Sequence, residues 1–271
     1  CHALSLITVG YSANALGGAG GPLAVLIIAI VAAELGKAVS KETKVDILVT
    51  PLVTIFAGVG LSMLIAAPIG AAASQVGTLI MWATEQAPLV MGILVSVIVG
   101  VALTLPISSA AICAALGLTG LAGGAAVAGC CAQMVGFAVM SYKENGVGGL
   151  VSQGLGTSML QMGNIIKNPR IWIAPTLASA ITGPLATCLF HFEMNGAAVS
   201  SGMGTCGLVG QIGVYTGWVS DIAAGTKAAI TPMDWAAMVL LCFVLPAVLS
   251  VVFCEVERKL GWIKEGDLKL N

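Results

Sequence analysis

The chain has 271 residues and a formal net charge of −1; 8% of its residues are charged, 58% are hydrophobic, and the mean hydropathy is +1.02. A soluble domain carries about 25% charged residues, so this composition excludes a soluble enzyme, and the absence of a basic excess excludes a nucleic-acid-binding protein. Aromatic residues make up only 5% and there are 35 glycines, which favours closely packed membrane helices over a transmembrane β-barrel.

Apolar runs predict an all-α integral membrane protein, a multi-pass helical bundle formed by one membrane-embedded domain over residues 1–271. The chain begins with Cys1 rather than Met, so we expect the natural chain to begin earlier. A helix needs about 20 apolar residues to cross about 30 Å of hydrocarbon. The candidate spans, in chain order, are 23–35, 45–67, 89–107, 121–142, 171–192 and 235–254.

Three further segments are long enough to cross but rich in Gly, Ser, Thr, Gln and Asn, namely 68–86, 146–166 and 196–218. Irregular backbone survives at membrane depth only where protein or a water-filled cavity satisfies its polar groups. We therefore expect re-entrant hairpins or broken helices in these segments. In transporters, such interrupted segments point to the binding site.

An internal repeat links two of these segments. Residues 151–160 (VSQGLGTSML) match residues 199–208 (VSSGMGTCGL) at six of ten positions, and 74–78 is a weaker third copy. A basic residue and a Pro-containing span precede the copies at 74–78 and 199–208, which predicts two repeat-like halves at about 44–86 and 170–213. Chance similarity in a Gly-, Ala- and Ser-rich chain is the alternative.

The distribution of Lys and Arg predicts the orientation, because basic residues favour the cytoplasmic side. With the cluster around Lys41, residues 167–170 and the C-terminus in the cytoplasm, 9 of the 11 basic residues lie inside. Segment 146–166 must then cross the membrane; a hairpin there would instead place Arg170 outside. The charged residues left outside are Glu85, Lys143, Glu144, Glu193, Asp221, Lys227 and Asp234.

The sequence offers one cluster suited to binding a solute: His191, Glu193 and Asn195, at the end of a span. Ionisable groups near the bilayer are costly and are functional by default, and these side chains can exchange hydrogen bonds with hydroxyl groups. The alternative is a wetted loop at the lipid headgroups.

Two amides and two glycines in the repeat copies extend this candidate site. Gln75 and Gln211 would supply amide hydrogen bonds, although amides also hold membrane helices together. Gly77, Gly204 and Thr205 belong to Gly-Thr turns, where glycine permits close backbone approach; a tight turn alone explains them equally well. We expect the solute where hairpins 74–78 and 199–211 approach one another.

Catalytic, metal and cofactor sites are not expected. The chain has two histidines and no Cys-x-x-Cys, which does not suit a zinc site. It contains no Gly-x-Ser-x-Gly elbow, P-loop or dinucleotide fingerprint.

Four stretches resemble the enzyme IIC family of the phosphotransferase system, and more closely its stand-alone branch labelled after the perfringolysin O regulator. They are Lys44-Val-Asp-Ile-Leu-Val-Thr-Pro51, Ala67-Pro-Ile-Gly70, Asn168-Pro-Arg-Ile-Trp-Ile-Ala-Pro-Thr176 and Gly202-Met-Gly-Thr-Cys-Gly-Leu-Val-Gly-Gln211. The resemblance implies a homodimeric sugar-permease fold with two repeats and re-entrant hairpins, in the bacterial inner membrane with the C-terminus cytoplasmic.

That resemblance also implies a function. Sugar-transporting relatives hold the sugar with a Glu in a Gly-x-x-Glu motif and with a His; this chain lacks that motif at the expected hairpin, so His191 and Glu193 would be functional analogues. The expected activity is translocation of a small sugar-like solute, with phosphoryl groups supplied by separate IIA and IIB carriers. The alternatives are an uncoupled transporter of a non-sugar or lipid-like solute and a ligand-sensing membrane regulator.

Overall fold

The computed structural model describes residues 3–17, 21–40 and 46–270, and within these ranges the chain forms α, π and 3-10 helices and no strand. The prediction of an all-α protein is confirmed. Four of the described helical runs are long and apolar enough to cross a membrane, and Pro88–Thr104 is a shorter apolar helix. The cluster around Lys41, the start of the first repeat-like half at Lys44, and Cys1 lie outside the described residues.

Contacts divide the chain into two units, 1–79 with 114–117, and 80–113 with 118–271. The first contains α1 (Ala3–Gly17), α2 (Gly21–Val39), α3 (Asp46–Leu61), the π-helix Ser62–Ala66 and most of α4 (Ala67–Gln86). Helices α1, α2 and α3 pack against one another through small and β-branched side chains, among them Val9, Ala13 and Ile28. Region 1–35, for which a single span at 23–35 is predicted, forms two helices, α1 and α2.

The second unit holds the remaining helices. They are α5 (Pro88–Thr104), α6 (Ser109–Leu116, which ends in the first unit), α7 (Gly120–Met140), α8 (Tyr142–Val151), α9 (Met162–Lys167), α10 (Ile173–Pro184), α11 (Val209–Ala223), α12 (Pro232–Val239) and α13 (Leu245–Lys259). Short π and 3-10 turns extend several of them, so that α10 belongs to a run over Pro169–Leu189 and α12 with α13 to a run over Pro232–Lys259. These runs coincide with the predicted spans.

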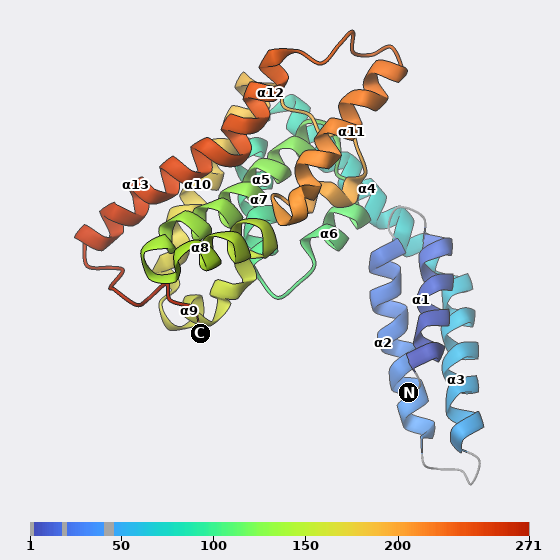
Figure 1. The fold of residues 1–271 in the computed structure, drawn as a ribbon. Coiled ribbons are helices and arrows are strands. Elements are labelled where there is room, and N and C mark those ends of the chain that lie inside the picture. The colour runs from blue at the N-terminus through green and yellow to red at the C-terminus, as the bar shows by residue number, and fades with distance from the viewer. Residues whose placement is uncertain (1–2, 18–20, 41–45, 271) are drawn as a thin grey trace. The chain divides into compact units, whose positions relative to one another are not determined.

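Helix α7 lies at the centre of this unit, with α5, α10 and α13 packed around it (Figure 1). It is rich in Gly and Ala and almost wholly buried. A Cβ on Gly129 would lie 2.0 Å from the carbonyl oxygen of Ser96 on α5, so only glycine permits this close approach. Small residues that let backbones touch are typical of helix packing in membranes.

Two of the three predicted interruptions are present. Segment 146–166 is broken by a non-helical Gly146, a π-turn (Ser152–Gly156) and a 3-10 turn (Ser158–Gln161). Segment 196–218 is broken by 3-10 turns before α11 begins. The predicted hairpin or broken helix at 68–86 is wrong, because α4 is a continuous helix from Ala67 to Gln86; Gly77 packs closely against the Leu116 carbonyl instead of forming a turn.

Both ends of segment 146–166 lie at the same end of the second unit. Asn145, before the segment, donates to the Leu268 carbonyl at 2.8 Å, and Asn164, near its end, donates to the Lys269 carbonyl at 2.9 Å. The predicted crossing is therefore wrong: the segment leaves this end and returns to it.

The predicted separation of Glu144 and Lys143 from the C-terminus is wrong for the same reason. Arg258 forms an ion pair with Glu144 at 3.0 Å, and Lys143 forms one with Glu255 at 2.7 Å. Charge counts alone did not reveal these contacts. Seven of the eight basic residues of the second unit lie in the segments that meet at this end, 142–145, 164–170 and 255–270.

Candidate functional site

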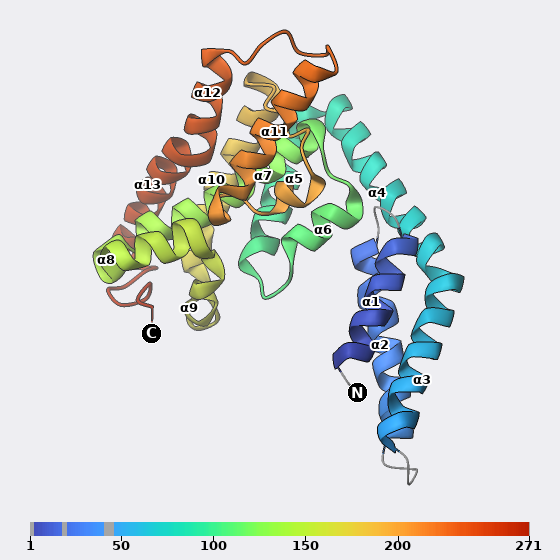
Figure 2. The ribbon, with the colours of Figure 1, turned by 45° about the vertical axis from the view of Figure 1, so that its right-hand side comes forward.

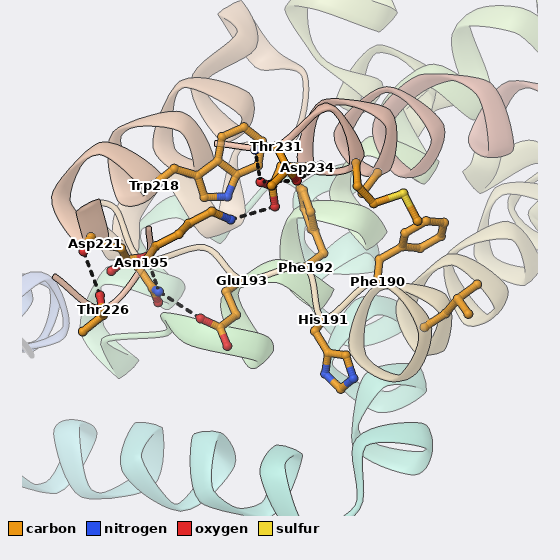
Figure 3. Close-up of a pocket in the computed structure, with 14 residues that line it drawn as sticks. Phe190, His191, Phe192, Glu193, Asn195, Trp218, Asp221, Thr226, Thr231 and Asp234 are labelled. Atoms are coloured by element: carbon orange, nitrogen blue, oxygen red, sulfur yellow. Dashed lines mark hydrogen bonds and ion pairs between the residues drawn. The ribbon is translucent and has the colours of Figure 1, made fainter. Parts of the chain in front are cut away.

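A cavity of about 560 Å³ opens at the other end of the second unit, where the run that contains α10 ends and α12 begins. His191, Glu193 and Asn195, three of the predicted solute-binding residues, line it from the loop after Leu189 (Figure 3); their role in binding stays a prediction. Trp218 and Asp221 reach it from α11, and Asp234 from α12. Figure 3 shows Asp221 and Asn195 on one side of the cavity and Phe190 on the other.

Asn195 holds two carboxylates together. Its Nδ2 donates to Glu193 Oε2 at 3.0 Å and to Asp221 Oδ2 at 2.9 Å. Hydrogen bonds to charged acceptors are stronger than neutral ones, and here a single amide offsets part of the repulsion between two like charges. Each carboxylate keeps further lone pairs that can accept hydrogen bonds from a solute.

A second polar group forms where α12 begins. Asp234 accepts from Lys227 Nζ at 2.7 Å and completes a capping box with Thr231, whose Oγ1 accepts from the Asp234 N–H at 3.3 Å. Lys227 Nζ also lies 5.4 Å from the centre of the Trp218 ring, a cation–π contact. These contacts fix the side chains of the loop between α11 and α12, so this wall of the cavity is preorganised.

His191 occupies a strained position at the cavity. Its φ is +43°, a left-handed conformation that non-glycine residues rarely adopt. Such strain costs of order 1–3 kcal/mol and clusters at functional sites.

Three carboxylates face a single Lys ammonium among the described lining residues, which gives the cavity an excess of negative charge.

The structure places Gly204, Thr205 and Gln211 elsewhere, against α7. A Cβ on Gly204, whose φ is +52°, would lie 2.8 Å from the Cys130 backbone carbon. Thr205 is fully buried, and Gln211 Nε2 donates to Cys131 Sγ at 3.2 Å. These residues hold helices together, which was the alternative interpretation of the amides and turns.

The two strong copies of the repeat, 151–160 and 199–208, meet in space, a contact that their sequence similarity alone does not predict. Thr205 Oγ1, in the copy 199–208, donates to the carbonyl of Gly154, in the copy 151–160. A cavity of about 440 Å³ lies beside this junction and is lined mainly by apolar residues, including Leu103, Ile107 and Met203.

Gln75 and Gly77 lie on α4 in the first unit. Gln75 is exposed. Gly77 lies directly against the Leu116 carbonyl, within the same unit, so that a Cβ there would overlap the oxygen. This contact accounts for the glycine; a role for either residue in binding a solute stays a prediction.

Asp221, Lys227 and Asp234 also line the cavity, although they are not among the predicted site residues. One signal pointed to them, since the charge distribution had put these residues and Glu193 on the same side of the membrane. Only the tertiary fold brings the loop at 191–195 against the loop between α11 and α12.

Comparison with known proteins gives one match. The family model described as "Phosphotransferase system, EIIC" matches residues 3–270. Searches of curated proteins and of solved structures found no match. With nearly the whole chain matched, with apolar helices long enough to span a bilayer, and with interrupted helices beside them, this membrane protein belongs to the EIIC family of the phosphotransferase system.

Proposed function

We propose that the chain is the permease subunit of a phosphotransferase-type system and that it binds a small, sugar-like solute in the cavity at His191, Glu193 and Asn195. The observation that carries the proposal is the convergence of Asn195, Glu193 and Asp221 in one 560 Å³ cavity. A volume of this size is in the range of small-molecule sites.

The lining suits a polyhydroxy compound. Carboxylates accept hydrogen bonds from hydroxyl groups, and the His191 imidazole and the Thr226 hydroxyl can both donate and accept. Phe190 and Met233 provide an apolar wall for the C–H face of a sugar ring. A solute with hydroxyl groups on one face and C–H groups on the other matches both walls.

A second candidate function is supported by the excess of negative charge. Three carboxylates against a single ammonium favour a cationic solute over an anionic one. In this alternative the chain carries or senses a non-sugar, amine-bearing compound without phosphoryl coupling.

The partners follow from the family. We propose that separate IIA and IIB carriers supply the phosphoryl group and that the chain acts as a homodimer in a bacterial inner membrane. The end that carries residues 142–145, 164–170 and 255–270 would face the cytoplasm, because basic residues gather there. The cavity at 189–237 would then open to the outside.

A stabilisation screen followed by an uptake assay tests the proposal. Purified protein is heated with sugars, amino sugars and polyamines, since a specific ligand raises the unfolding midpoint by mass action. Uptake of the best ligand is then measured in vesicles with and without IIA and IIB. Uptake of a sugar as its phosphate supports the permease subunit, whereas carrier-independent uptake of unmodified solute supports the alternative. Stabilisation without uptake in either case would contradict a transport function.

A further inference from the structure

The C-terminal residues 262–270, here called the C-terminal strap, run beside α8 and α9 (Figure 2). Side chains of these helices and of the turns beside them bind the backbone of the strap. Asn145 donates to the Leu268 carbonyl and accepts from the Leu270 N–H, both at 2.8 Å. Gln161 and Asn164 donate to the carbonyls at 268 and 269. Ile263 and Leu268 anchor the strap, with 3% and 0% of their surface exposed.

Glu257 lies near the end of α13, shortly before the strap begins. It is 4% exposed, and neither carboxylate oxygen has a hydrogen-bond partner among the described residues. Its backbone carbonyl accepts from the Trp262 N–H at 2.9 Å, where the strap begins. Cys254, one turn earlier on α13, packs in one cluster with Ile263 and Leu268.

Among the described residues, no cation forms an ion pair or a hydrogen bond with the Glu257 carboxylate. Helices α7 and α10, which pack on α13, contain no charged residue, and the π-turn before α13 contains none. On α8, Glu144 and Lys143 pair with Arg258 and Glu255, and Arg170 lies over the Trp262 ring. None of the remaining titratable groups on the nearby elements has a described ion pair or hydrogen bond with Glu257; they are Cys130, Cys131, Tyr142, Lys167, Cys242, Cys254, Lys259, Lys264, Glu265, Asp267 and Lys269.

A buried carboxylate without a partner is far more costly than a buried neutral carboxylic acid. We propose that Glu257 is a proton-binding site: the folded state holds its carboxyl group as the neutral acid, and loss of that proton releases the C-terminal strap. Because an ionised carboxylate needs water, and the strap packs on α13 at Cys254, one turn from Glu257, detachment of the strap is the local rearrangement that would hydrate Glu257. The proposal does not depend on the solute site, which lies at the other end of the unit.

Cysteine labelling tests the proposal. In the full chain, in detergent, the labelling rate of Leu268→Cys is divided by that of the exposed Lys269→Cys, which cancels the pH dependence of thiolate chemistry. Both rates come from mass spectrometry of the C-terminal peptide, so the native cysteines can remain. We expect this ratio to rise about tenfold or more between pH 5.5 and 8.5. In the background of Glu257→Gln, a neutral isostere of the acid, the ratio should stay flat, and in that of the exposed Glu265→Gln it should rise as in the parent.

Three outcomes would overturn the proposal. The labelling ratio could stay constant with pH in the parent chain, or it could rise equally in the Glu257→Gln background. It could also change when choline replaces sodium at constant pH and not change with pH. Because Leu268→Cys removes a buried side chain, amide hydrogen exchange of the peptide at 262–270 in the unsubstituted chain provides a second measurement. Its rates, corrected for the intrinsic effect of pH on exchange, should rise over the same interval, and unchanged rates would count against strap release.

Discussion

The ion pair between α8 and α13 provides a sensitive test of how the interrupted segment returns to its starting end. Glu144 Oε1 accepts from Arg258 Nη2 at 3.0 Å, and its Oε2 accepts from the Leu268 N–H at 2.8 Å. The side chains of Arg258 and Glu144 are only 16% and 10% exposed. We therefore expect Glu144→Gln to leave the Arg258 guanidinium buried without a countercharge.

Removing one member of a buried pair costs about 3–5 kcal/mol. Because both side chains keep some contact with solvent, we expect the lower end, about 3 kcal/mol. In a domain of about 150–250 residues, 1 kcal/mol shifts the unfolding midpoint by about 2–4 °C, so Glu144→Gln should lower the midpoint by about 6–12 °C. Thermal unfolding in detergent, followed by circular dichroism, measures this shift.

The adjacent residue provides a matched control. Lys143 pairs with Glu255 between the same two helices, but these side chains are 70% and 45% exposed, and exposed pairs contribute little. Lys143→Gln should therefore leave the midpoint within the error of the measurement. Equal effects of the two substitutions would refute the assignment of Glu144 to a buried contact with α13.

Three further substitutions have defined outcomes in the same unfolding assay. Gly183→Ala would place a Cβ 2.3 Å from the Gly92 carbonyl oxygen, and this overpacking should destabilise the protein by about 1–3 kcal/mol; no loss would contradict the close approach of α5 and α10. Thr205→Val leaves the Gly154 carbonyl without this donor and should cost about 1–3 kcal/mol, whereas an unchanged midpoint would argue against the contact between the repeat copies. His191→Gly relieves a φ of +43° and should stabilise by about 1 kcal/mol; a loss of stability would show that the conformation is not strained.

Sequence length and hydropathy predicted the spans well because a bilayer sets the length of an apolar run independently of what packs around it. The run Pro232–Lys259 is an example. Polar composition was a poorer guide. It predicted breaks in 146–166 and 196–218, where Gly146, Gly204 and Gly207 adopt positive φ. It failed at 68–86, where glycine fits a continuous helix because Gly77 packs closely on another backbone segment.

The candidate site was predicted in part for a similar reason. His191, Glu193 and Asn195 are close in sequence, so local composition revealed them. Asp221 and Asp234 are separated from them by helices, and only the return of the chain through α11 and α12 brings these carboxylates to the same cavity. The direction of segment 146–166 was missed because a count of charges does not show which charges pair.

The most direct test of the proposed function is the equilibrium binding of the solute identified by the stabilisation screen, measured on purified variants. Glu193→Gln and Asn195→Ala each remove hydrogen-bonding capacity from the cavity. A lost hydrogen bond to a partly buried group typically costs about 1–3 kcal/mol, which corresponds to a Kd about 5- to 150-fold higher. We expect both variants to weaken binding by such factors, while Glu265→Gln, at the opposite end of the unit, binds as the unsubstituted protein does. Unchanged affinity in both cavity variants would contradict the assignment of this cavity as the solute site.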